Sequence, residues 1–246
     1  MIIQSMPYPG GIAPPPTPYT TAQVIALFGT GILGAAYDFA DRAKLAVNAD
    51  GTGGPPGIGN AVKWAVDQSP NGNHLRNTMA SGMPVCRARG IETSGTNYGL
   101  FSIPTLGDWP AMAEPFEIIG TMEQLTYSFN GRLLGLANAS TPVLMQSGAS
   151  GAIRFENGDL GPNLSPGLNR EFTLAASFSS TARTQSLDGG IPQNLGLGNA
   201  TVSALLLGSN YDGTNLARIR FKRLLIIGRA LNAAERSGVA AWAAAS

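Results

Sequence analysis

The hydrophobic pattern of this chain is that of β-strands over most of its length. From Glu171 to Phe178 polar and apolar residues alternate, and Phe116 to Met122 alternates in the same way, with Glu117 and Glu123 on the polar face. A period of two is typical of a strand with one buried face. Further strands are predicted at 133–136, 143–145, 153–155, 204–207 and 218–227. The apolar run from Leu224 to Ile227 predicts that the last of these is a central strand.

Two short helices are predicted, one towards each end of the chain. Thr20 or Thr21 can cap a helix with Val24, Leu27 and Phe28 on one face, and Gly29 is placed to end it. Near the C-terminus Asn232 and Glu235 have the spacing of a capping box. One face of the helix that follows carries Val239, Trp242 and Ala243. We expect this second helix to lie against the edge or end of the β-structure.

Turn signals separate the predicted strands. Six Asn-Gly or Asp-Gly pairs occur, at 50–51, 71–72, 130–131, 157–158, 188–189 and 212–213. Such pairs favour hairpins because both residues tolerate positive φ. Many strands with frequent turns and little helix predict an all-β fold of two packed antiparallel sheets. A chain of 246 residues suits one such domain.

The first 19 residues form a separate, proline-rich segment. Six prolines between Pro7 and Pro18 favour extended polyproline-like backbone and remove the donors that a sheet needs. We therefore divide the chain into an arm with a short helix, residues 1–30, and a sandwich domain, residues 31–246. We predict that Pro7, Tyr8, Pro14, Pro15, Pro16 and Tyr19 bind a partner subunit. Packing of the arm on its own domain is the alternative.

Composition excludes several classes of function. Charged residues make up only 13% of the chain, 16 basic against 15 acidic, so no basic field indicates a nucleic-acid partner. The apolar stretch from Val24 to Tyr37 is too short for a membrane span, and no leader pattern precedes it. We expect a soluble chain without a membrane partner. Cys86, the single cysteine, excludes an intrachain disulfide and a cysteine-based zinc site, and we expect it to be a small buried side chain.

No pattern of catalytic residues stands out. His74 is the only histidine, so any Ser-His-Asp or Cys-His arrangement would have to use it as the base. It follows a turn-like segment, where a histidine is more often a loop or packing residue. Glycoside hydrolysis needs two carboxylates at a fixed separation. Glu117 and Glu123 share a strand face that we expect to be solvated, and the E-x-D-x-x-E string of jelly-roll glycosidases is absent. The sequence therefore predicts a protein that is not an enzyme.

Two polar or aromatic features have both a structural and a functional interpretation. Arg218, Arg220 and Lys222, followed by Arg223, place three basic side chains on one face of an alternating strand. This face either keeps the strand soluble or meets an acidic partner. Trp109 lies beside a proline and is either a packing residue or a platform on which a sugar stacks.

Several motifs resemble the concanavalin A-like, laminin-G-like modules of bacteriophage structural proteins. They are Tyr37-Asp38-Phe39-Ala40-Asp41, the Gly-rich stretch 50–59, Trp64-x-x-Asp67-x-Ser69-x-Asn71-Gly72-Asn73-His74, and Gly228-Arg229-Ala230-Leu231-Asn232-x-x-Glu235. The similarity covers Ala35 to Ala245. It implies a jelly-roll β-sandwich of two antiparallel sheets that ends in the short C-terminal helix. The extended arm and the short N-terminal helix, predicted above from the residues themselves, precede the region of similarity.

The resemblance also implies functions. The first is a non-enzymatic virion structural protein, a capsid decoration or tail accessory protein. It would be assembled in the host cytoplasm and present as a homo-oligomer. The resemblance gives the arm no role, and we expect the arm to anchor the protein to capsid or tail subunits. The alternative is a carbohydrate-binding, lectin-like module that attaches to host glycans. A secreted lectin-like domain is a third interpretation, against which the missing signal peptide counts.

Metal binding follows from the resemblance alone. Lectin relatives hold calcium on rim loops through carboxylate and carbonyl oxygens. Asp38, Asp41, Asp50 and Asp67 are possible donors here, but no calcium-loop pattern such as D-x-D-x-D-G connects them. Aspartates in such positions also cap turns by accepting backbone hydrogen bonds. We expect no metal and no cofactor, with calcium as the alternative.

Overall fold

The computed structural model describes residues 16–77, 82–95, 109, 111–128, 130–136, 143–147, 151–157, 159–196, 200–208 and 215–245. The predictions made for Pro7, Tyr8, Pro14 and Pro15, and for the turn at 212–213, lie outside these residues. No helix in the described segments is long and apolar enough to cross a membrane.

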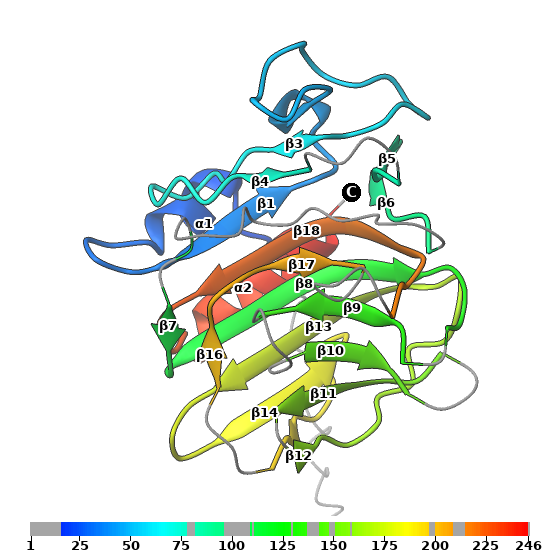
Figure 1. The fold of residues 1–246 in the computed structure, drawn as a ribbon. Coiled ribbons are helices and arrows are strands. Elements are labelled where there is room, and N and C mark those ends of the chain that lie inside the picture. Colours follow the sequence, from blue (N-terminus) through cyan, green and yellow to red (C-terminus); the bar gives the residue numbers. More distant parts are fainter. Residues whose placement is uncertain are drawn as a thin grey trace, which may run out of the picture.

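Two antiparallel sheets pack face to face and confirm the predicted jelly-roll-like β-sandwich (Figure 1). The larger sheet has the order β15 (Gln193–Asn194), β14 (Arg183–Leu187), β13 (Glu171–Phe178), β8 (Phe116–Gln124), β18 (Ile219–Ile227), β6 (Gly90–Glu92), β5 (Val85–Arg87), and β1 (Gly34–Asp38) also pairs with β18. The smaller sheet has the order β12 (Asp159–Leu160), β11 (Ile153–Asn157), β10 (Val143–Gln146), β9 (Arg132–Gly135), β17 (Leu206–Leu207). The described residues also form two short ladders, β16 (Thr201–Val202) with β7 (Met112–Ala113) and β2 (Leu45–Ala46) with β3 (Trp64–Ala65) and β4 (Leu75–Arg76).

The predicted central strand is central. β18 pairs with β8 along its length on one side, and with β6 and β1 in succession on the other. Its inward side chains join those of β8 and β13 in the core between the sheets. Phe116 stacks on Phe178 there, with ring centroids 4.6 Å apart, so the alternation seen in both sequences corresponds to one shared buried face.

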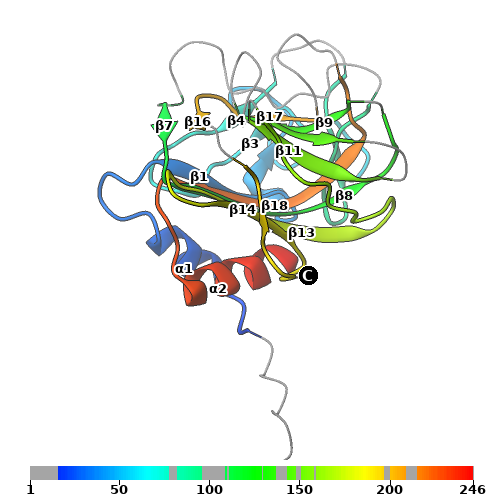
Figure 2. The same cartoon turned by 90° about the horizontal axis from the view of Figure 1, so that it is seen from below.

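Both predicted helices are present, and both pack on the outer face of the larger sheet (Figure 2). α1 (Thr21–Ala26) begins at Thr20 and α2 (Ala233–Ala244) begins at Asn232, each with a capping box. The prediction that α2 lies at an edge or end is wrong. The outer face of the central strands is itself apolar at Ile119, Leu225 and Ile227, and α2 covers it with Val239 and Trp242.

A β-bulge in β18 changes the predicted basic face. The register with β8 shifts between Phe221 and Arg223, so Lys222 leaves the row of Arg218 and Arg220 and is buried. Its ammonium donates to the Glu171 carboxylate and to the carbonyl of Ala244, at the C-terminal end of α2. Cations are favoured at a helix C-terminus, where carbonyls are left unpaired.

The other basic residues of β18 are paired as well. Arg218 and Arg220 donate to Glu92, which also accepts from Arg87 at 2.7 Å. Arg223 donates to Asp38 at 2.8 Å and to the carbonyl of Trp242, and its guanidinium lies 5.4 Å from the Trp242 ring centroid. These arginines tie strands and α2 together, so the predicted free basic face is a set of internal ion pairs.

Glu117 corrects a second expectation. Its side chain points to the outer face of β8 as predicted, but α2 covers it and only 1% of it is exposed. The carboxylate accepts from the backbone N–H of Leu231 and from the Arg236 guanidinium. Its role is therefore to join the sheet to α2.

Candidate functional site

The connection between β3 and β4, residues 66–74, is organised by the buried carboxylate of Asp67. This carboxylate accepts hydrogen bonds from the backbone N–H groups of Ala36, Ser69 and Asn73 at 2.8–2.9 Å, and from the Ser69 hydroxyl. Burial raises the pKa of Asp67, although these hydrogen bonds oppose the rise. Asp67 thus holds the connection against β1. Asn71 and Gly72 lie within this longer connection and not in a two-residue hairpin.

His74 and Trp64 pack against each other in the same region. The Nδ1 atom of His74 accepts from the backbone N–H of Asp67 at 3.0 Å, and its ring centroid lies 4.9 Å from that of Trp64. Gly51 lies close to the indole as well, since a Cβ built on it would stand 3.2 Å from the ring. His74 therefore has a packing and turn-fixing role.

An exposed loop, residues 48–60, stands beside Trp64. Asp50 accepts from the backbone N–H and the hydroxyl of Thr52 at 2.9 and 2.6 Å, and Thr52 accepts in turn from the Asn48 amide at 3.0 Å. These hydrogen bonds from Thr52 lower the pKa of Asp50, which is fully exposed. Further along the same loop Asn60 is exposed, and Ile58 has 61% of its surface in solvent. The loop thus presents hydrogen-bonded polar side chains on either side of Gly51, which lies against the Trp64 indole.

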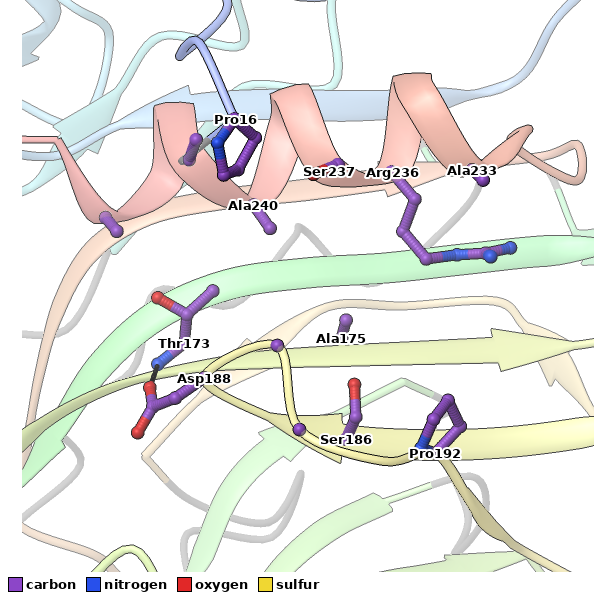
Figure 3. Close-up of a pocket in the computed structure, with 14 residues that line it drawn as sticks. Pro16, Thr173, Ala175, Ser186, Asp188, Pro192, Ala233, Arg236, Ser237 and Ala240 are labelled. Carbon is purple, nitrogen blue, oxygen red and sulfur yellow. Dashed lines mark hydrogen bonds between the residues drawn. The ribbon is translucent and has the colours of Figure 1, made fainter. Parts of the chain in front are cut away.

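A groove of about 540 Å³ runs between α2 and the β13–β14 side of the larger sheet (Figure 3). Thr173, Ala175 and Ser186 contribute from the strands, and Asp188, Gly189, Gly190 and Pro192 contribute from the turn that follows β14. The helix contributes mainly small side chains, namely Ala233, Ser237, Ala240, Ala241 and Ala244, together with Arg236. Volumes of this size are usual for binding pockets.

The described end of the N-terminal arm lies at this groove. The backbone N–H of Tyr19 donates to the carbonyl of Gly238 at 3.1 Å, and a Cβ on Gly238 would overlap with the tyrosine ring. Pro16 lines the groove, and Figure 3 shows it beside α2 near Ala240. Of the residues predicted to bind a partner, the described ones, Pro16 and Tyr19, therefore lie against α2 of their own chain.

The possible calcium donors do not converge. Asp38 accepts from the backbone N–H groups of Ala40 and Asp41 and pairs with Arg223. Asp41 caps the short 3-10 helix η1 (Arg42–Lys44), and Asp67 and Asp50 organise the turns described above. Within the described segments no three His, Cys, Asp or Glu residues lie together in a way that could hold a metal ion. Each of these aspartates has the turn-capping role.

The carboxylates considered for hydrolysis are engaged in ion pairs. Glu117 pairs with Arg236 beneath α2, and Glu123 pairs with Arg220. Trp109 is a packing residue with 6% of its surface exposed, in the core between the sheets, and Cys86 is fully buried. Burial raises the pKa of the Cys86 thiol.

Sequence reasoning did not identify the groove or the 48–60 loop as sites. The spacing of Ala233, Ser237, Ala240 and Ala244 marks a strip of small side chains on one helix face, which is the signal that the groove leaves in the sequence. Asn48, Asp50 and Thr52 lie in a Gly-rich stretch, which indicated only a turn.

Comparisons with known proteins establish the fold. No family model matches the sequence, and no curated protein does. Among solved structures, the chain is similar to a GH54 α-L-arabinofuranosidase (TM-score 0.53, 14% identity, 85% of this chain and 62% of that one). It is also similar to the binding domain of Paraclostridial Mosquitocidal Protein 1 (0.52, 13%, 82% and 52%). A third is the binding domain of botulinum neurotoxin serotype G (0.51, 13%, 72% and 48%). The chain thus spans about half to three fifths of these proteins.

Proposed function

We propose that this chain is a carbohydrate-binding β-sandwich module and that it binds glycans through the 48–60 loop. Two proteins of similar fold are binding domains and another is a glycosidase by name, which supports a binding role with a saccharide ligand. Fold alone does not fix function, so the proposal rests on the loop.

The observation that carries the proposal is the exposed, internally fixed row of Asn48, Asp50 and Thr52. Sugar hydroxyls both donate and accept, and amide, carboxylate and hydroxyl groups supply both kinds of partner. Because hydrogen bonds within the loop already fix these side chains, little conformational entropy is lost on binding. Ile58 and the partly exposed Trp64 supply apolar surface for the carbon faces of a sugar.

A non-catalytic role fits the site. Glu117 and Glu123 are held in ion pairs away from the loop, and His74 is engaged by the backbone of Asp67. Hydrolysis would need an acid and a second carboxylate facing one saccharide. Among the described residues Asp50 is the acid that the loop itself presents.

A glycan array probed with the labelled full chain tests the proposal. We expect binding to a restricted class of glycans, reduced at least tenfold in Asp50→Ala because the variant loses a direct contact and the turn that fixes Thr52. Asn194→Ala is the matched control: Asn194 accepts from the backbone N–H of Gly196 in a similar turn, on the opposite edge strand β15. Equal binding by both variants, or no glycan bound, contradicts the proposal.

A second proposal keeps the virion role that the sequence resemblance implies. In it the module belongs to a bacteriophage particle, is assembled in the host cytoplasm, and is fixed to capsid or tail subunits by its arm. The packing of Pro16 and Tyr19 on α2 supports it, since this contact would give the arm a defined exit from the sandwich. Deletion of residues 1–19 tests it: normal incorporation of the truncated chain into particles contradicts anchoring by the arm.

A further inference from the structure

The groove between α2 and the β13–β14 side has no assigned role in glycan binding. We propose that it receives the N-terminal arm, residues 1–15, of a second copy of this chain, so that two copies exchange arms. The 48–60 loop shares no residue with this groove, and the two proposals can fail separately.

The chemistry of the groove fits an uncharged, proline-rich segment. Its walls are mostly Ala, Gly, Pro and Ser. Its two charged side chains are already engaged, since Asp188 accepts from Arg170 and from the backbone of Thr173, and Arg236 donates to Glu117. Residues 1–15 contain no charged side chain and four prolines. Polyproline segments commonly bind in grooves because their extended form is set before binding.

The arm joins the described part of the chain at the groove. The backbone of Tyr19 is hydrogen-bonded to Gly238, and Pro16 forms part of the groove wall. Residues 1–15 are therefore joined to the rest of the chain at the groove. Prolines at 14, 15, 16 and 18 favour stiff, extended backbone there, and the first glycines that permit a reversal are Gly10 and Gly11. Six residues in polyproline form span about 19 Å, close to the roughly 18 Å length of a twelve-residue helix.

A segment of that stiffness would extend about as far as the groove is long before the chain can reverse. It therefore disfavours insertion of the arm into its own groove and favours insertion into a neighbouring copy. About six extended residues are enough to fill a groove as long as α2, so only part of the arm is needed. Reciprocal insertion makes a closed twofold dimer in which each copy gives one arm and receives one. The two contacts reinforce each other because formation of the first makes the second intramolecular.

The oligomeric state in solution tests the exchange. By light scattering after gel filtration, we expect the full chain to have twice its 25.4 kDa mass, and a chain lacking residues 1–15 to be monomeric. Ser237→Arg, which fills the groove from α2, is expected to be monomeric too. Ala234→Arg adds the same charge on an exposed part of α2 that does not line the groove, and it is expected to remain dimeric. Circular dichroism checks that every variant is folded.

Mixing the two monomeric variants distinguishes the exchange of arms between copies from the insertion of an arm into the groove of its own chain. The truncated chain retains the groove and Ser237→Arg retains the arm, so one arm-in-groove contact can form between them. We expect a heterodimer that is weaker than the full-chain dimer and is populated at high concentration. A full chain that stays monomeric at all concentrations overturns the proposal, as does a dimer that survives the deletion. Failure of the two variants to associate at any concentration also overturns it.

Discussion

Replacing Glu92 with Gln probes the electrostatics that fix β18 in the larger sheet. The Glu92 side chain is 4% exposed, and it accepts from Arg87, Arg218 and Arg220. Burial alone would raise the pKa of Glu92, but the hydrogen bonds from the three arginines outweigh it and lower the pKa from 4.5 to about 2. The folded chain therefore holds this carboxylate in its ionised form.

The size of the effect follows from that shift. A difference of roughly 2.5 pKa units at about 1.36 kcal/mol per unit corresponds to about 3 kcal/mol of stability. Because the folded pKa is depressed, this contribution is fully present above about pH 4.5 and is lost as the pH falls towards 2. The arginines are partly exposed, and solvent screens their interaction with Glu92. The value of about 3 kcal/mol is therefore an upper limit.

Urea unfolding between pH 7 and pH 2.5 measures the effect. At pH 7 we expect Glu92→Gln to be about 2–3 kcal/mol less stable than the wild type, and the difference to shrink as the pH falls through the acid range. Glu235→Gln is the control, because Glu235 pairs with Arg229 at the more exposed start of α2 and should cost about 1 kcal/mol or less. Parallel loss of stability with falling pH in wild type and Glu92→Gln would refute this reasoning.

Three further changes test the packing. Asp67→Ala leaves three backbone donors without their acceptor and is expected to cost about 3 kcal/mol or more in urea unfolding, whereas a cost below 1 kcal/mol contradicts its organising role. Trp242→Ala removes a side chain that is 2% exposed and should cost about 3–5 kcal/mol, seen as a lower melting temperature; an unchanged melting temperature is inconsistent with α2 as part of the core. Gly238→Ala should displace the Tyr19 ring, so hydrogen exchange of the Tyr19 amide rises while β18 stays protected; unchanged exchange at Tyr19 argues against the contact.

The strands and helix starts were predictable because they depend on local pattern. The alternation from Glu171 to Phe178 predicts a strand, and the spacing of Asn232 and Glu235 predicts the start of a helix. The structure confirms both. The position of α2 was not predictable, because it depends on apolar outer-face residues that come from distant strands, such as Ile119 and Leu225.

The candidate sites were less accessible to sequence reasoning. The bulge at Lys222 shifts one residue in a regular alternation, and nothing in the local pattern marks it. Pro16 and Tyr19 were predicted to bind a partner subunit, and in the structure they contact a helix from the other end of their own chain. The hydrogen bonds that fix Asp50 and Thr52 are local, yet a Gly-rich segment indicates only that a turn occurs.

Side-by-side binding of the wild type, Asp50→Ala and Asn194→Ala to the same immobilised glycans tests the central claim most directly. A carbohydrate-binding module that uses the 48–60 loop predicts selective binding by the wild type and Asn194→Ala, and at least a tenfold loss in Asp50→Ala. Undiminished binding by Asp50→Ala, or no binding by the wild type to any glycan, would contradict it.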